Sequence, residues 1–414
     1  MTELLPYEAE DEELLDFCRE LDLWRGLLDR RGVLPRRWQG RLRRDLEAEA
    51  VAASTSMEGV PVTVDEVRRI LAGDQPPDVD AQDRELVEGY REAMSYVLRR
   101  ADDEAFQWNR ELIVGIHDRV LAGRHSEGAG RVRTDRPAFV VNRLTGEQVF
   151  LPPPGEDVSD LLDAACGRME QEQPHPAVGA AWVHVAVAAI HPFRDGNGRV
   201  ARVLGSLAMY RGGFTRPEFT SLEEWWGRHR SDYYAAFGSL GSEFNPDANV
   251  TPFLRAHLGA QLSQIRALDA RERVEREIWT ALEEVAEERS LHRRVSNALW
   301  DAFFGREVTA GYYRSLTDVS PPTATKDLGG AVSAGLLVAE GQRRGRRYLA
   351  HPRLYEAVAE VLIMDVSGSP EAVRDQITAE LAGRSAMSGE AFGFPRRPFD
   401  RESRDVSGAP RSPE

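Results

Sequence analysis

The feature that most constrains the fold is a polar, glycine-rich turn between two apolar helical segments near the middle of the chain. The segments run from Ala180 to Ile190 and from Val200 to Tyr210, and the turn between them reads HPFRDGNGR. The start of a helix has unpaired N–H groups and the positive end of the helix dipole, and both attract anions. The sequence therefore predicts a mainly α-helical protein with an anion-binding site at the turn.

The residue types in the turn fit a phosphorylated ligand. Gly196 and Gly198 have no Cβ, so the backbone can curl closely around phosphate oxygens. Arg199 and Arg202 lie three residues apart at the start of the second helix and can point toward one anion. These residues predict a site for a polyphosphate.

Two further side chains supply reactive groups. Asp195 is a hard oxygen ligand for Mg²⁺, which commonly binds one carboxylate together with substrate phosphates. His191 has a pKa near neutrality when unperturbed, so it can act as a general base toward a hydroxyl group. The turn is therefore a candidate centre for phosphoryl or nucleotidyl transfer.

The stretch from His191 to Arg202 resembles the signature of the Fic family, His-x-Phe-x-Asp/Glu-Gly-Asn-Gly-Arg-x-x-Arg, at every fixed position. The resemblance extends over roughly residues 105–245. It includes a helix at 108–123, the segment GRVR at 130–133 before a flap, and Tyr233-Tyr234 after the motif. It implies a Fic-type helical core with a small β-hairpin flap.

The resemblance also implies a role for each residue. His191 would deprotonate a Tyr, Thr or Ser hydroxyl of a target protein, which would attack the α-phosphorus of ATP. Asp195 would hold Mg²⁺. Family branches that transfer phosphate carry other residues in place of 196–199, so the sequence here favours AMP transfer, with self-modification expected. The nucleotide would contact Gly196, Asn197, Gly198, Arg199, Arg202, Tyr233 and Tyr234.

A second segment, Ser54 to Gly59 (STSMEG), resembles the inhibitory motif of the same family. It implies that Glu58 forms an ion pair with Arg202 and hinders productive ATP binding, while Ser54 caps or anchors the inhibitory helix or is an ordinary helix residue. In some family members this glutamate also orients a water molecule that removes AMP. De-adenylylation by means of Glu58 therefore remains an alternative.

The segment 136–150 is predicted to form a hairpin from Phe139-Val140-Val141 and Gln148-Val149-Phe150. Its edge could receive an extended segment of the target protein by strand addition. The alternative is a loop that covers the nucleotide.

The segment 308–349 resembles a winged helix-turn-helix domain. Its second helix opens at Ser320-Pro321, and arginines 343, 344, 346 and 347 lie on the expected wing. DNA binding by this module would make the chain a nucleotide-sensing transcription regulator. Asp327 on the second helix and a net charge of −15 favour a protein contact or a homodimer instead.

We expect a helical region at 1–104 with the inhibitory helix, a core domain at 105–258, a linking helix at 259–290, a winged-helix-like domain at 291–355, and a C-terminal helix with a disordered tail at 356–414. No apolar run is long enough to span a membrane, the N-terminus lacks a signal-peptide pattern, and two cysteines suggest no disulfide framework. A cytoplasmic location is expected.

Overall fold

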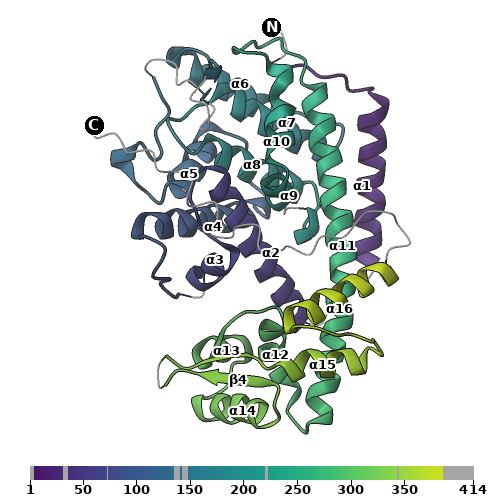
Figure 1. Cartoon of the computed structure of the whole chain (residues 1–414). Coiled ribbons are helices and arrows are strands. Elements are labelled where there is room, and N and C mark those ends of the chain that lie inside the picture. The colour runs from purple at the N-terminus through teal and green to yellow at the C-terminus, as the bar shows by residue number, and fades with distance from the viewer. Residues whose placement is uncertain are drawn as a thin grey trace. The chain divides into compact units, whose positions relative to one another are not determined.

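The structure is a computed structural model that describes residues 4–30, 36–71, 73–134, 140–141, 148–219, 222–342 and 345–385; for 36–45, 141 and 217 only the backbone is described. The chain divides between residues 265 and 266 into two compact units. Each unit is described separately (Figure 1).

The first unit is helical apart from one short hairpin. Within the described residues, four helices precede the predicted core domain, in the region 1–104 that was expected to be helical, and breaks at residues 58–63 and 73–80 separate some of them. The elements are α1 (Glu12–Arg30), α2 (Arg36–Met57), α3 (Val64–Leu71), α4 (Ala81–Ala101), α5 (Arg110–Val120), β1 (Val140–Val141), β2 (Gln148–Phe150), α6 (Val158–Met169), α7 (Pro176–Ile190), α8 (Asn197–Arg211), α9 (Leu222–Arg228), α10 (Arg230–Ala236) and the first part of α11 (Thr251–Glu288).

The core of this unit is built around α7 and α8. Pro176 at the first position of α7 and the His175 side chain, which accepts from the Ala177 N–H, start the helix. Almost every residue of α7 and α8 is buried. α7 is apolar on nearly all sides, whereas α8 combines an apolar segment with the buried polar residues Asn197, Arg199 and Arg202. The predicted turn therefore lies where two buried helices meet, with α8 beginning directly after Gly196.

The predicted hairpin is present as a short antiparallel pair. Val140 lies opposite Phe150 and Val141 opposite Gln148, with an irregular register between them. Phe139 and the expected connection at 142–147 lie outside the described residues.

The second unit combines helices with a three-stranded antiparallel sheet in the order β3-β5-β4. Ser320 caps α14 by accepting from the Thr323 N–H, and Pro321 occupies the first turn, as predicted. The helix pair and hairpin fall where the winged-helix prediction places them, and the winged-helix assignment itself stays a prediction. The elements are the rest of α11, α12 (Ser296–Phe303), β3 (Val308–Thr309), α13 (Ala310–Thr317), α14 (Pro321–Ser333), β4 (Leu337–Glu340), β5 (Arg347–Ala350), α15 (Pro352–Val361) and α16 (Pro370–Ser385).

Two helix boundaries differ from expectation. The linking helix starts at Thr251 rather than 259, because Pro252 fits the first turn and the apolar stripe continues into it. Two helices, α15 and α16, stand where one C-terminal helix was expected; His351 caps the first by accepting from the Arg353 N–H. The tail from residue 386 lies outside the described residues. Within the described helices, none combines the length and the apolar character needed to cross a membrane.

Candidate active site

The turn between α7 and α8 is held in a fixed conformation by its own residues. His191 closes α7 in the left-handed region with φ 51°, an unusual conformation for a residue with a side chain. Asn197 accepts from the Phe193 N–H at 2.9 Å and donates to the Phe193 carbonyl at 2.8 Å. The Asn197 amide group, expected to line a phosphate nest, is thus engaged in closing the turn.

The orientation of the His191 ring leaves one nitrogen suited to accept a proton. Its Nδ1 lies 3.3 Å from the Ala188 carbonyl, which can only accept, so Nδ1 carries the hydrogen and Nε2 keeps its lone pair. Burial lowers the pKa of the imidazole below its usual value, and the nearby Arg133 cation acts in the same direction. The ring is therefore neutral at neutral pH, as a general base must be.

Arg133 fixes the backbone on which His191 stands. Its Nε donates to the His191 carbonyl at 2.7 Å, and its Nη2 donates to the carbonyls of Ile190 at 3.1 Å and Pro153 at 2.7 Å. Its own N–H donates to the Pro192 carbonyl at 2.9 Å. One buried guanidinium thus joins the end of α7 to the segment after β2. In the sequence this residue stood out only as part of GRVR.

His117 supports the turn from the other side. Its ring stacks on Phe193 with centroids 3.6 Å apart, Nε2 donates to the Asp195 carbonyl at 3.0 Å, and Nδ1 accepts from the Gly130 N–H at 3.1 Å. Burial lowers its pKa to about 4, so the ring stays neutral and can both donate and accept. No role was predicted for His117 from the sequence; its position on one helical face with apolar neighbours was the available signal.

Asp195 and Arg199 form an ion pair at the mouth of the turn. Arg199 is buried, whereas 54% of the Asp195 side chain is exposed, and the Nη2–Oδ2 distance is 2.9 Å. The described residues contain no cluster of three or more acidic, histidine or cysteine side chains that could hold a metal. A single exposed carboxylate still fits Mg²⁺, because this ion takes its remaining ligands from phosphates and water.

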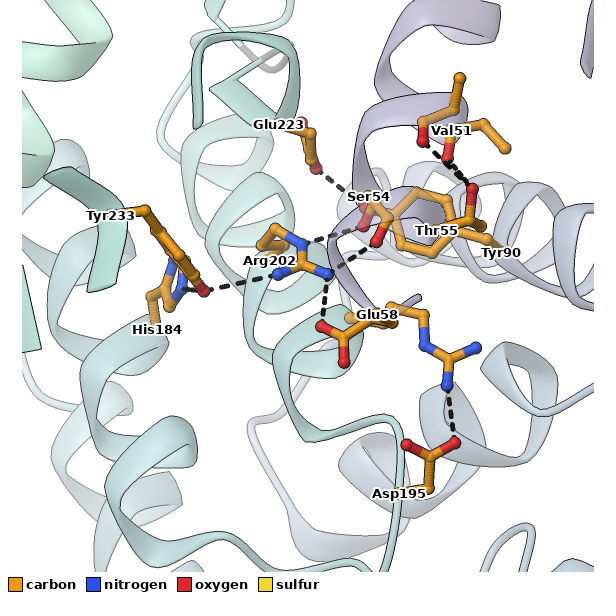
Figure 2. A network of polar contacts seen from close by, with 12 residues as sticks. Val51, Ser54, Thr55, Glu58, Tyr90, His184, Asp195, Arg202, Glu223 and Tyr233 are labelled. Carbon is orange, nitrogen blue, oxygen red and sulfur yellow. Dashed lines mark hydrogen bonds and ion pairs between the residues drawn. The ribbon is translucent and has the colours of Figure 1, made fainter. Parts of the chain in front are cut away.

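Arg202 is buried and receives three contacts from α2 (Figure 2). Its Nε donates to Ser54 Oγ at 2.9 Å, and its Nη2 donates to the Ser54 carbonyl at 3.1 Å and to Glu58 Oε1 at 2.9 Å. The predicted ion pair between Glu58 and Arg202 is present, and Ser54 contacts Arg202 from within α2 instead of capping its end. Burial alone would lower the pKa of Arg202, but Tyr233, Glu58 and Tyr90 together raise it. The arginine is firmly cationic.

The Glu58 carboxylate also lies against the N-terminus of α8. A Cβ atom at Gly198 would collide with Glu58 Oε1 and would stand 3.1 Å from Arg202 Nη1. Glu58 directly follows the last residue of α2, where a negative charge is unfavourable, yet it meets the positive end of α8, where a negative charge is favoured. Glu58 thus occupies the position where the sequence predicts a phosphate.

A second polar layer lies behind Arg202. The Tyr90 hydroxyl donates to Glu223 Oε1 at 2.9 Å, and burial raises the pKa of both groups. Glu223 and Arg202 also line a small cavity of about 20 Å³ together with His257. This layer was not predicted, because its members lie far apart in the sequence.

The two tyrosines after the motif differ in position. Tyr233 is buried, and its hydroxyl lies 3.4 Å from Arg202 Nη1 and 3.0 Å from Nε2 of His184, which is also buried. Tyr234 is 58% exposed. The structure therefore brings Tyr233, but not Tyr234, against Arg202.

Comparison with known proteins agrees with this geometry. The sequence model of the Fic/DOC family matches residues 107–209, which include the whole turn and the start of α8. The chain carries a Fic domain. A protein adenylyltransferase Fic of Nematostella vectensis is 29% identical over 206 residues, 49% of this chain and 44% of that protein. Protein adenylyltransferase fic-1 of Caenorhabditis elegans is 29% identical over 212 residues, 49% of this chain and 37% of that protein.

Solved structures support the same fold. A Fic family protein from Desulfovibrio desulfuricans G20 superposes with a TM-score of 0.54 at 19% identity, over 83% of this chain and 98% of that one. A Fic domain containing signaling protein from Bacteroides thetaiotaomicron VPI-5482 superposes with a TM-score of 0.51 at 19% identity, over 62% of this chain and 95% of that one. The chain spans less than half the length of the two curated relatives.

Proposed function

We propose that the protein is an adenylyltransferase that moves AMP from ATP to a Tyr, Thr or Ser hydroxyl of a target protein, and of itself, under restraint by Glu58. The observation that carries the proposal is the arrangement of His191, Arg199 and Arg202 around the N-terminus of α8. Relatives that share the Fic domain are named protein adenylyltransferases.

In the proposed reaction, the free Nε2 of His191 removes the proton from the incoming hydroxyl, whose oxygen bonds to the α-phosphorus as pyrophosphate leaves. The rigid turn, fixed by Arg133 and His117, sets the position of that nitrogen. Asp195 would hold Mg²⁺, which supplies charge neutralisation to the phosphates. Gly196, Gly198, Arg199 and Arg202 would contact the phosphate oxygens.

Glu58 would restrain this reaction by competing with ATP. Its carboxylate lies on Gly198 and pairs with Arg202, which is the place and the cation that the outer phosphates would use. A phosphate cannot enter this space while the carboxylate remains. The reaction should therefore be slow until Glu58, alone or together with α2, withdraws from this place.

Removal of AMP is a second candidate activity, and one observation favours it. The Glu58 carboxylate lies against Gly198, at the end of the turn that begins with His191, and its charge acts to raise the pKa of the imidazole, although burial lowers that pKa overall. A carboxylate beside the base could orient a water molecule for attack on an AMP-modified side chain.

The test of the proposed function uses ATP labelled on the α-phosphate, Mg²⁺ and the full chain. The parent should label itself weakly, Glu58→Gly strongly, and Glu58→Gly combined with His191→Ala not at all, although the last variant should still bind ATP. Glu47→Gln on the same helix is the control, because Glu47 pairs with Arg91 at the surface, away from Arg202. The proposal would be contradicted if Glu58→Gly labelled neither itself nor the proteins of a cell extract. Release of AMP from labelled protein only when Glu58 is present would support the second activity.

For the second unit we propose a protein contact rather than a DNA contact. Asp327 of α14 is buried and accepts from Arg294 Nε at 2.6 Å and from the Tyr313 hydroxyl at 3.0 Å, so it cannot face a groove. Arg347 of the wing is paired with Glu307 at 2.7 Å. Salt-dependent binding of duplex DNA that is lost in Arg346→Glu would contradict this proposal.

A further inference from the structure

We propose that a groove after β2 binds a basic, extended segment of the target protein next to the hydroxyl that receives AMP. This inference rests on the proposed function and concerns the substrate that the same site takes. The groove, named here the proline groove, has a volume of about 510 Å³ and lies between residues 151–154, the start of α6 and residues 243–246. Its volume is in the range of pockets that bind ligands.

The walls of the proline groove are fixed by backbone hydrogen bonds. The Leu151 N–H donates to the Ser242 carbonyl at 2.9 Å, and the Phe244 N–H donates to the Leu151 carbonyl at 2.8 Å. Pro152 and Pro153 are buried, and proline fixes its own backbone angle. The groove is therefore preformed, which reduces the entropy lost when an extended chain binds.

The charge of the proline groove selects the kind of partner. Asp157, Asp160 and Glu243 line it and are exposed, whereas no lysine or arginine is among the described residues that line it. Within the part of the chain that the structure describes, these three carboxylates have no ion-pair partner. Leu161 and Phe244 supply apolar surface between them. Arginine matches both properties, because its aliphatic stem packs on apolar surface while its guanidinium pairs with carboxylates.

The proline groove is connected to the reacting centre in two ways. Arg133 donates to the carbonyl of Pro153 in the groove wall and to the carbonyl of His191, so a single side chain spans the two. In addition, β2 ends at Phe150 and the groove begins at Leu151. A target segment that pairs with the flap would therefore continue into the groove with its arginine a few residues from the modified hydroxyl.

The experiment uses the full chain with Glu58→Gly and three sets of fluorescein-labelled peptides. All share one threonine, the only hydroxyl side chain, in a Gly-Ala-Pro background and differ in carrying arginine, glutamine or glutamate on either side. Fluorescence anisotropy measures binding, and transfer of labelled AMP measures KM and kcat. Arginine peptides should bind most tightly and lose affinity with added salt, and their advantage in transfer should lie in KM.

Two variants on α6 form a matched comparison of a carboxylate inside the groove with one outside it. Asp160→Asn should weaken binding of arginine peptides about twofold to fivefold without affecting glutamine peptides. Asp163→Asn, whose carboxylate pairs with Arg110 outside the groove, should have no such effect. Equal binding of the arginine and glutamine sets, or equal effects of the two variants, would overturn the groove assignment. Binding of arginine peptides without AMP transfer would refute the proposed function alone, while transfer without preference for arginine would refute the groove alone.

Discussion

Replacing Glu58 with glutamine changes the charge at the end of α2 with almost no change in shape. In the parent, one Glu58 oxygen accepts from Arg202 at 2.9 Å, with 3% of the arginine and 18% of the glutamate side chain exposed. A hydrogen bond with a charged partner contributes about 1.5–3 kcal/mol. We place the Glu58–Arg202 pair, in which both partners are charged, at the upper end of this range and the glutamine–Arg202 bond, in which only the arginine is charged, at the lower end. Glutamine should therefore weaken this contact by about 1–1.5 kcal/mol.

That difference translates into nucleotide affinity, because the proposed phosphate site and the Glu58 carboxylate exclude each other. At about 1.4 kcal/mol per factor of ten, Glu58→Gln should bind ATP about fivefold to tenfold more tightly than the parent. Glu58→Gly removes the whole contact and frees the space over Gly198, so its gain should be about tenfold to a hundredfold. The affinity for ATP should therefore rise from the parent to Glu58→Gln and again to Glu58→Gly.

Isothermal titration calorimetry with Mg²⁺-ATP measures the affinities of the parent, Glu58→Gln and Glu58→Gly directly, without any target protein. Glu47→Gln makes the same charge change on α2 at a surface pair and should match the parent. The competition argument would be refuted by parental affinity in both Glu58 variants, or by a gain in Glu47→Gln as large as in Glu58→Gln.

Three further predictions concern the support of the turn. Because burial lowers the pKa of His191, kcat/KM of the Glu58→Gly protein should stay constant above neutral pH and fall only as the pH drops below about 6.5; a midpoint above that value would contradict the argument. Arg133→Lys leaves buried carbonyls unpaired and should lower the free energy of unfolding by about 2–4 kcal/mol in urea denaturation, and kcat should fall with little change in ATP affinity. His117→Phe keeps the stacking on Phe193 but loses both hydrogen bonds, so its unfolding free energy should fall by about 2 kcal/mol or more; parental stability would show that these bonds contribute nothing.

Local signals in the sequence located the site well. The apolar segments around the turn predicted α7 and α8, and Ser320-Pro321 predicted the start of α14, because caps and apolar runs depend on neighbouring residues. The start of α11 was placed too late because Pro252 is equally compatible with a helix end and with a first turn.

Contacts between residues far apart in the chain were harder to predict from the sequence. The pairing of Glu58 with Arg202, 144 residues apart, came from family resemblance and could not have come from spacing. The hydrogen bond between Tyr90 and Glu223 had no such guide, because both residues look like ordinary members of amphipathic helices. Arg133 was equally inconspicuous, since a buried arginine that donates to backbone carbonyl groups has no local sequence signature.

The attachment of Arg202 to α2 has a thermodynamic consequence. Ser54 lies in α2 and Glu58 directly follows it, so on the proposed function docking of this helix and binding of ATP at Arg202 are coupled equilibria. Such coupling is reciprocal: the factor by which a docked helix reduces the affinity for ATP is also the factor by which bound ATP loosens the helix. The cellular ATP level would then set, in part, how readily the end of this helix detaches, and a partner that captures the detached helix would bind more tightly when ATP is abundant.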